Sequence, residues 1–140
     1  MAINSITKPL AFIVLIIFCI DSFAVESASD FNNFWEIFRA AVLANNTSHV
    51  KALTKFPLMI KGTLDEDKTI LIKEADFDSA IETLLAQDTG LRKKPQTMSQ
   101  FIKENKVIDD SLITKNEAVV GNFRFIKISG NWYFVSAYTE

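Results

Sequence analysis

Glycine, histidine and cysteine are scarce in this chain, and each scarcity excludes a type of chemistry. The 140 residues include four glycines, one histidine and one cysteine. No two glycines lie close enough in the sequence to form a phosphate-binding loop, so the usual nucleotide-binding motifs are excluded. A zinc site of the usual kind needs several histidine or cysteine ligands. We therefore expect no metal and no cofactor.

Recognisable catalytic patterns are lacking as well. His49 is the only histidine, and its polar neighbours favour a solvated surface position over the role of a general base. The chain has no G-x-S-x-G pattern that would hold a nucleophilic serine. Charge of one sign is not in large excess, because 15 basic and 17 acidic residues leave a net charge of −2. No strong field would draw the protein to nucleic acid or to an anionic membrane.

The N-terminus does contain a recognisable pattern, that of a secretory signal peptide. Lys8 is the only charged residue before an apolar run over residues 10–20. Ser22 and Ala24 then supply the small side chains that a signal peptidase requires. The run is too short to span a bilayer, which takes roughly 20 apolar residues, and no second run of this kind follows it.

We therefore predict a signal peptide over residues 1–24 and a single globular domain over residues 25–140, located in the periplasm or secreted. Ala28 is the alternative cleavage position. Cys19, the only cysteine, belongs to the leader, so the mature domain would have no disulfide. Two other interpretations stay open: a lipid anchor on Cys19, which the bulky residues before it disfavour, and an uncleaved membrane anchor, which Asp21 disfavours.

Helical periodicity appears in four segments after the leader. Apolar and aromatic residues recur at steps of three and four along residues 29–46, which predicts an amphipathic helix with an aromatic face. A shorter helix is expected over residues 47–55, and the helical spacing returns over residues 77–85. Thr97 and Gln100 have the spacing of a capping box, so another helical turn should begin there.

Alternating and β-branched segments predict two hairpins. Residues 58–64 and 69–73 should form the first, and residues 118–128 and 132–138 should form a second, tight hairpin around Gly130 and Asn131. We also expect a strand over residues 106–114.

The order of these elements predicts the fold class. Helix, helix, hairpin, helix, short helix and terminal β meander are typical of an α+β domain. In such a domain the N-terminal helices pack on one face of a curved antiparallel sheet.

Four sequence motifs carry a resemblance to a known group of proteins. They are Phe34-Trp35-x-x-Phe38-x-x-Ala41-Val42, Phe56-Pro57-Leu58, Val120-Gly121-Asn122-Phe123-Arg124-Phe125 and Gly130-Asn131-Trp132-Tyr133-Phe134-Val135. Together they resemble small exported bacterial domains of unknown function that are similar to the nuclear transport factor 2-like, or cystatin-like, superfamily. The resemblance implies a cone-like fold in which a long N-terminal helix lies across a strongly bent sheet, with an apolar pocket in the cone between them. No catalytic dyad of that superfamily can be matched here, so it leaves the chemistry open.

A pocket of this kind would have a small set of lining residues. The aromatic stripe of the long helix has the spacing of any helix that faces a core, and a core is the favoured reading. Arg124 would need a carboxylate or an anionic ligand if it pointed inward, and an outward position is favoured. The candidate lining residues are Trp35, Phe38, Phe123, Arg124, Phe125 and Tyr138.

Taken together, these features predict a small binding module in the periplasm or outside the cell. It would either hold an apolar ligand in the cone or dock a protein, such as a toxin or an envelope enzyme. The alternatives are a small isomerase or hydratase that uses Asp, Tyr or Arg inside the cone, and a non-catalytic envelope accessory. Ionisable side chains converging in a closed cavity would favour the enzyme, whereas a filled interior would favour protein docking.

Overall fold

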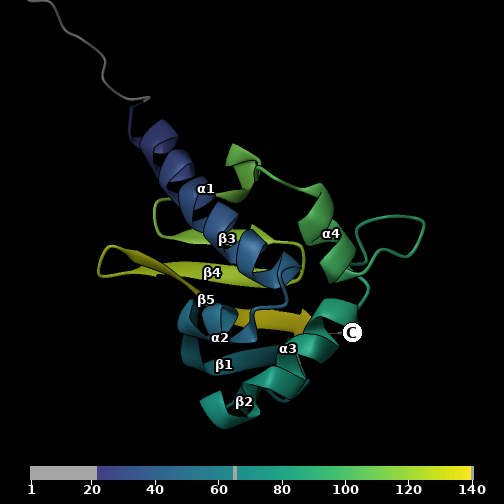
Figure 1. Cartoon of the computed structure of the whole chain (residues 1–140). Coiled ribbons are helices and arrows are strands. Elements are labelled where there is room, and N and C mark those ends of the chain that lie inside the picture. Colours follow the sequence, from purple (N-terminus) through teal and green to yellow (C-terminus); the bar gives the residue numbers. More distant parts are fainter. Residues whose placement is uncertain (1–21, 65, 140) are drawn as a thin grey trace, which may run out of the picture.

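The computed structural model describes residues 22–64 and 66–139 (Figure 1). Most of the predicted leader, including the apolar run and Cys19, lies outside the described residues. In the described part of the chain, no helix has the length and apolar character needed to cross a membrane.

The described residues form an α+β fold in which the helices pack against a five-stranded sheet. The α-helices are α1 (Ser22–Leu43), α2 (Thr47–Ala52), α3 (Phe77–Ala86) and α4 (Met98–Glu104). The strands are β1 (Thr54–Gly62), β2 (Ile70–Ile72), β3 (Glu117–Val120), β4 (Phe123–Ile128) and β5 (Asn131–Thr139), and the short 3-10 helices are η1 (Glu74–Asp76) and η2 (Asp110–Leu112). The predicted fold class and element order are confirmed.

The sheet is mixed rather than wholly antiparallel, which corrects one part of the prediction. Its strand order is β2-β1-β5-β4-β3. β5 runs parallel to β1, whereas the other neighbouring strands are antiparallel. The segment that contains α3 and α4 separates β1 from the terminal meander, and the last strand of that meander returns beside β1 in the same direction. Strand periodicity shows which side of a strand is apolar but carries no information on the direction of its partner.

Three local predictions about strands are also corrected. The expected strand over residues 118–128 is two strands, because the chain turns at Gly121, which has a φ of 57°. Residues 106–114 do not form a strand and contain η2, whose first turn is capped by the Asp109 carboxylate. β1 begins at Thr54, earlier than expected, and its ladder with β5 is irregular between Thr54 and Met59, where Pro57 has no N–H to donate.

The helix face and the terminal hairpin agree with the predictions. Helix α1 lies across the meander (Figure 1), and its aromatic side is buried against the sheet. The capping box at the start of α4 is present, with the Thr97 hydroxyl accepting from the Gln100 amide at 3.2 Å and the Gln100 side chain accepting from the Thr97 amide at 3.0 Å. The last hairpin is present, but its two-residue loop is Ser129 and Gly130 instead of the expected Gly130 and Asn131, because Asn131 already pairs with Ile128. Ser129 and Gly130 both have positive φ, as a primed turn requires.

Candidate functional site

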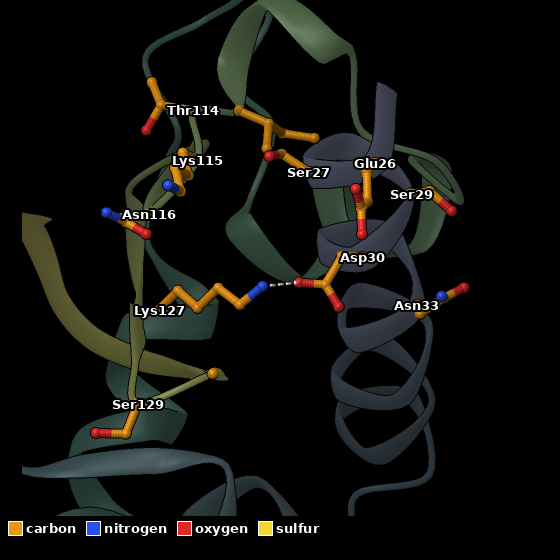
Figure 2. Close-up of a pocket in the computed structure, with 12 residues that line it drawn as sticks. Glu26, Ser27, Ser29, Asp30, Asn33, Thr114, Lys115, Asn116, Lys127 and Ser129 are labelled. Carbon is orange, nitrogen blue, oxygen red and sulfur yellow. Dashed lines mark hydrogen bonds and ion pairs between the residues drawn. The ribbon is translucent and has the colours of Figure 1, made fainter. Parts of the chain in front are cut away.

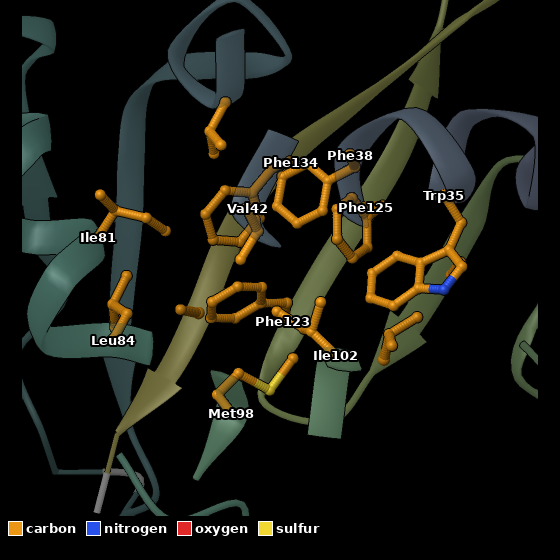
Figure 3. Close-up of a cluster of buried hydrophobic side chains, with 14 of the residues drawn as sticks. Trp35, Phe38, Val42, Ile81, Leu84, Met98, Ile102, Phe123, Phe125 and Phe134 are labelled. Atoms are coloured by element: carbon orange, nitrogen blue, oxygen red, sulfur yellow. The ribbon is translucent and has the colours of Figure 1, made fainter. Parts of the chain in front are cut away.

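The space between α1 and the sheet is filled by aromatic side chains (Figure 3). Phe125 lies at the centre of this cluster and has no exposed surface. Its ring centroid is between 5.1 and 6.0 Å from the centroids of five other aromatic rings, which belong to Phe31, Phe34, Trp35, Phe38 and Phe134. Most of these pairs have the edge-to-face geometry of well-packed aromatic cores.

Helix α1 also holds the segment after α4 over this core. The Trp35 indole donates to the Asn105 carbonyl at 2.9 Å. The Arg39 guanidinium donates to two carbonyls near the end of α4, those of Ile102 at 2.9 Å and Lys103 at 2.7 Å. These carbonyls would otherwise lack a helical partner, and a cation is favourable at this end of a helix. The side of the core between α1 and α4 is thereby closed.

The six predicted pocket residues are divided between two faces of the sheet. Trp35, Phe38, Phe123 and Phe125 are packed inside the core. Arg124 and Tyr138 instead lie on the opposite face of the sheet, because side chains alternate along β4 and β5. The structure therefore brings the four core aromatic residues together and places the other two elsewhere.

Arg124 forms a two-point ion pair on that opposite face. Its Nε and Nη2 atoms donate to the two carboxylate oxygens of Glu117 in β3, at 2.8 and 3.1 Å. This hydrogen bonding lowers the pKa of Glu117 and raises the pKa of Arg124. Arg124 therefore points outward, the position that the sequence favoured, and it pairs with a carboxylate on the same outer face.

A polar hollow opens beside the first turns of α1 (Figure 2). We use this name for the surface depression of about 860 Å³ that is lined by α1, the loop before β3 and the turn between β4 and β5. At its edge, Asp30 accepts a hydrogen bond from Lys127 at 2.5 Å and another from the Trp132 indole at 2.9 Å. The sequence contained no signal for this contact, since 97 positions separate Asp30 from Lys127.

The Asp30 carboxylate is held in its ionised form. The hydrogen bond from Lys127 lowers the pKa of Asp30, with a further contribution from Trp132, and partial burial opposes them. The carboxylate therefore stabilises the fold at any pH above its unfolded pKa of about 4. That contribution is lost as the pH falls through the lower pKa of the folded state.

An apolar groove lies at the other end of the sheet, between β2 and α3. We use this name for the depression of about 550 Å³ whose floor is formed by Ile60, Ile70 and Ile72. The small side chains of Ala80 and Thr83 face it from α3. Its polar rim includes two carboxylates of the first turns of η1 and α3, those of Asp76 and Asp78.

The only histidine of the chain, His49, lines neither of these two depressions. His49 is exposed in α2, where its backbone amide donates to the side chain of Asn46 at 3.1 Å. Among residues 22–64 and 66–139, no three histidine, cysteine, aspartate or glutamate side chains are grouped so as to hold a metal ion.

Comparison of the chain with protein-family models, with curated proteins and with solved structures gives no match. The geometry of the described residues is therefore the basis for any functional proposal.

Proposed function

We propose that this chain is an exported binding module that docks a protein on its surface. The leader pattern over residues 1–24 supports export. Docking on the surface, rather than binding in the interior, is supported by one observation above all: the aromatic cluster fills the space in which a ligand of the resembling superfamily would be held.

The packing of this cluster leaves no room for a second molecule. Binding sites for small molecules are normally clefts or cavities of about 300–1,000 Å³. Phe125 has no exposed surface, and the ring centroids of Phe123 and Phe134 are only 4.5 Å apart. A ligand between α1 and the sheet would have to displace side chains from the hydrophobic core.

The carboxylates of Asp30 and Glu117 lack the raised pKa that a general acid needs at neutral pH. A general acid or base works best when its pKa lies near the working pH. The pKa values of Asp30 and Glu117 are instead lowered by their ion pairs with Lys127 and Arg124. Both carboxylates are therefore fully ionised at neutral pH, as expected for residues that connect elements of the fold.

The proposal can be tested by crosslinking in intact cells together with native mass spectrometry. The full chain, with its own leader, should be expressed at low level and treated with a lysine-reactive crosslinker that does not enter the cytoplasm. We expect a crosslinked complex with one defined protein, and a purified domain whose native mass equals that of its polypeptide alone. A retained metabolite, or the absence of any crosslinked protein, would contradict the proposal. A second exported domain of similar size and charge serves as the control for random crosslinking.

A further inference from the structure

The loop between α3 and α4 extends away from the domain beside α4 (Figure 1). Its base is fixed, because Thr89 and Gln96 are buried and the Thr89 amide donates to the Gln96 carbonyl at 2.9 Å. The Asn122 side chain also holds this base, through a hydrogen bond of 2.9 Å to the Asp88 carbonyl. Residues 90–95 between these anchors are all exposed, and we call them the basic loop. The loop therefore presents its tip to the surroundings from a firm base.

Positive charge is concentrated in the basic loop and at the end of α4. Residues 91–108 include five basic residues and a single acidic one, Glu104. Glu104 lies 3.4 Å from the Arg92 guanidinium and accepts from the Gln96 side chain at 2.7 Å, so the loop rests against the end of α4. We call the five basic residues of this region the basic surface: Arg92, Lys93, Lys94, Lys103 and Lys106.

The net charge of the chain conceals this surface. The chain as a whole has a net charge of −2, whereas residues 74–90 include five acidic residues and no basic residue. The two signs are thus segregated along the chain, and a local positive field is present although the sequence composition favoured none. Within residues 22–64 and 66–139, the four lysines of the basic surface are exposed and form no ion pair.

Large apolar side chains accompany these charges. Leu91, directly before Arg92, is 61% exposed, and Val107, directly after Lys106, is 72% exposed. Exposed apolar residues beside lysine and arginine are typical of segments that lie on a membrane. The apolar side chains enter the boundary between headgroups and acyl chains, while the cations stay at the level of the phosphates.

The kind of cation favours a lipid surface over a protein surface. Four of the five residues are lysines, and lysine is depleted at protein–protein interfaces. An ordered lysine loses much rotamer freedom, which a protein contact of fixed geometry requires. Mobile headgroups attract the ammonium groups without fixing them in one position. The leader pattern over residues 1–24 also predicts that the domain is released next to a membrane.

We propose that the basic surface docks on a bilayer that contains anionic phospholipids, with Leu91 inserted among the headgroups. The contact is peripheral, because the domain rests on the bilayer through one loop and one helix end. It goes beyond the proposed protein docking and does not depend on it.

Vesicle flotation provides the direct test. The protein is recovered after export of the full chain, so that the leader has been processed, and is mixed with vesicles of phosphatidylcholine or of phosphatidylcholine with about 30% phosphatidylglycerol. We expect flotation with the anionic vesicles only, and loss of most of it when the salt concentration rises from about 0.05 M to about 0.5 M. Failure to bind the anionic vesicles, or equal binding to both kinds, would overturn the proposal.

Charge reversal locates the contact on the molecule. The double variant Lys93→Glu with Lys94→Glu should bind the anionic vesicles at least about tenfold more weakly, because two attractive charges become repulsive. The double variant Lys68→Glu with Lys73→Glu makes the same change in net charge at exposed positions around β2, and it should bind like the unaltered protein. Equal weakening of both would show a general charge effect and would overturn the site.

A second matched pair tests the insertion of the loop. Leu91→Ser should weaken binding at least about threefold, because it removes the apolar side chain that leaves water. Leu64→Ser, at a leucine that is 69% exposed in the turn before β2, should have no effect. Unchanged binding of Leu91→Ser would overturn the insertion. All the altered positions are exposed, and circular dichroism confirms that the variants are folded.

Crosslinking in cells separates a lipid contact from a protein contact at the same surface. If the anionic vesicles are not bound while Lys93→Glu with Lys94→Glu abolishes the crosslinked complex, the basic surface docks a protein and the lipid proposal is wrong. If the vesicles are bound and no protein is captured, the membrane contact stands and the proposed function fails.

Discussion

Replacement of Phe125 by alanine tests whether the interior is as closely packed as the structure shows. Phe125 has no exposed surface, and its ring contacts five other aromatic rings. Deletion of a buried phenylalanine ring typically costs about 3–5 kcal/mol, from lost transfer free energy and from the cavity that remains. Because small domains have a total stability of about 5–15 kcal/mol, Phe125→Ala should remove a large fraction of it.

Urea unfolding followed by tryptophan fluorescence measures this loss directly. With a denaturant slope of about 2 kcal/mol per molar urea, the expected cost lowers the unfolding midpoint by about 1.5–2.5 M. Ile128→Ala is the matched control in the same strand, because Ile128 is 37% exposed and its truncation should lower the midpoint by less than about 0.5 M. A shift of this smaller size for Phe125→Ala would refute the close packing, and a ligand between α1 and the sheet would again be reasonable.

Three further predictions concern the polar contacts and the leader. Asp30→Asn should cost less than about 1 kcal/mol at neutral pH, because the ion pair is partly exposed, and the difference from the unaltered domain should shrink below about pH 4 in unfolding experiments. A difference that grows on acidification would contradict the lowered pKa. Thr97→Ala should lower the unfolding free energy by about 1 kcal/mol through loss of the capping box, while Thr97→Ser should have little effect. The intact mass of the secreted protein should show cleavage after Ala24, with Val25 as the N-terminal residue. An N-terminus at Ser29 would contradict this and would mean that processing removes Ala28, which is buried against the core.

Several elements of this fold could be predicted because their causes are local. The spacing of Thr97 and Gln100 is sufficient for a capping box, since both hydrogen bonds join residues three positions apart. The tight hairpin near Gly130 follows from the turn preferences of neighbouring residues. The aromatic stripe of α1 likewise follows from helical periodicity, which predicts a buried face from the residues of that helix alone.

The strand predictions failed where the outcome depends on distant partners. Residues 106–114 have the apolar content of a strand, but they are used to cover the core. The Asn32 side chain holds Ile108 by accepting from its amide at 2.8 Å and donating to its carbonyl at 3.1 Å. The parallel pairing of β1 with β5 was missed for a similar reason. Each strand has an apolar inner side whether its neighbour is parallel or antiparallel, so its own sequence does not indicate the direction of its partner.

The candidate sites lie almost wholly beyond what sequence reasoning reached. Periodicity placed Trp35 and Phe125 on inward faces, but whether such residues enclose a cavity or fill it depends on how side chains from the four helices and from four strands, β1, β3, β4 and β5, interlock. The contact of Asp30 with Lys127 and the groove beside β2 also join segments that are distant in the sequence. Local structure follows from interactions between near neighbours along the chain, whereas the filled interior and the apolar groove result from packing between elements, for which a single sequence contains no direct signal.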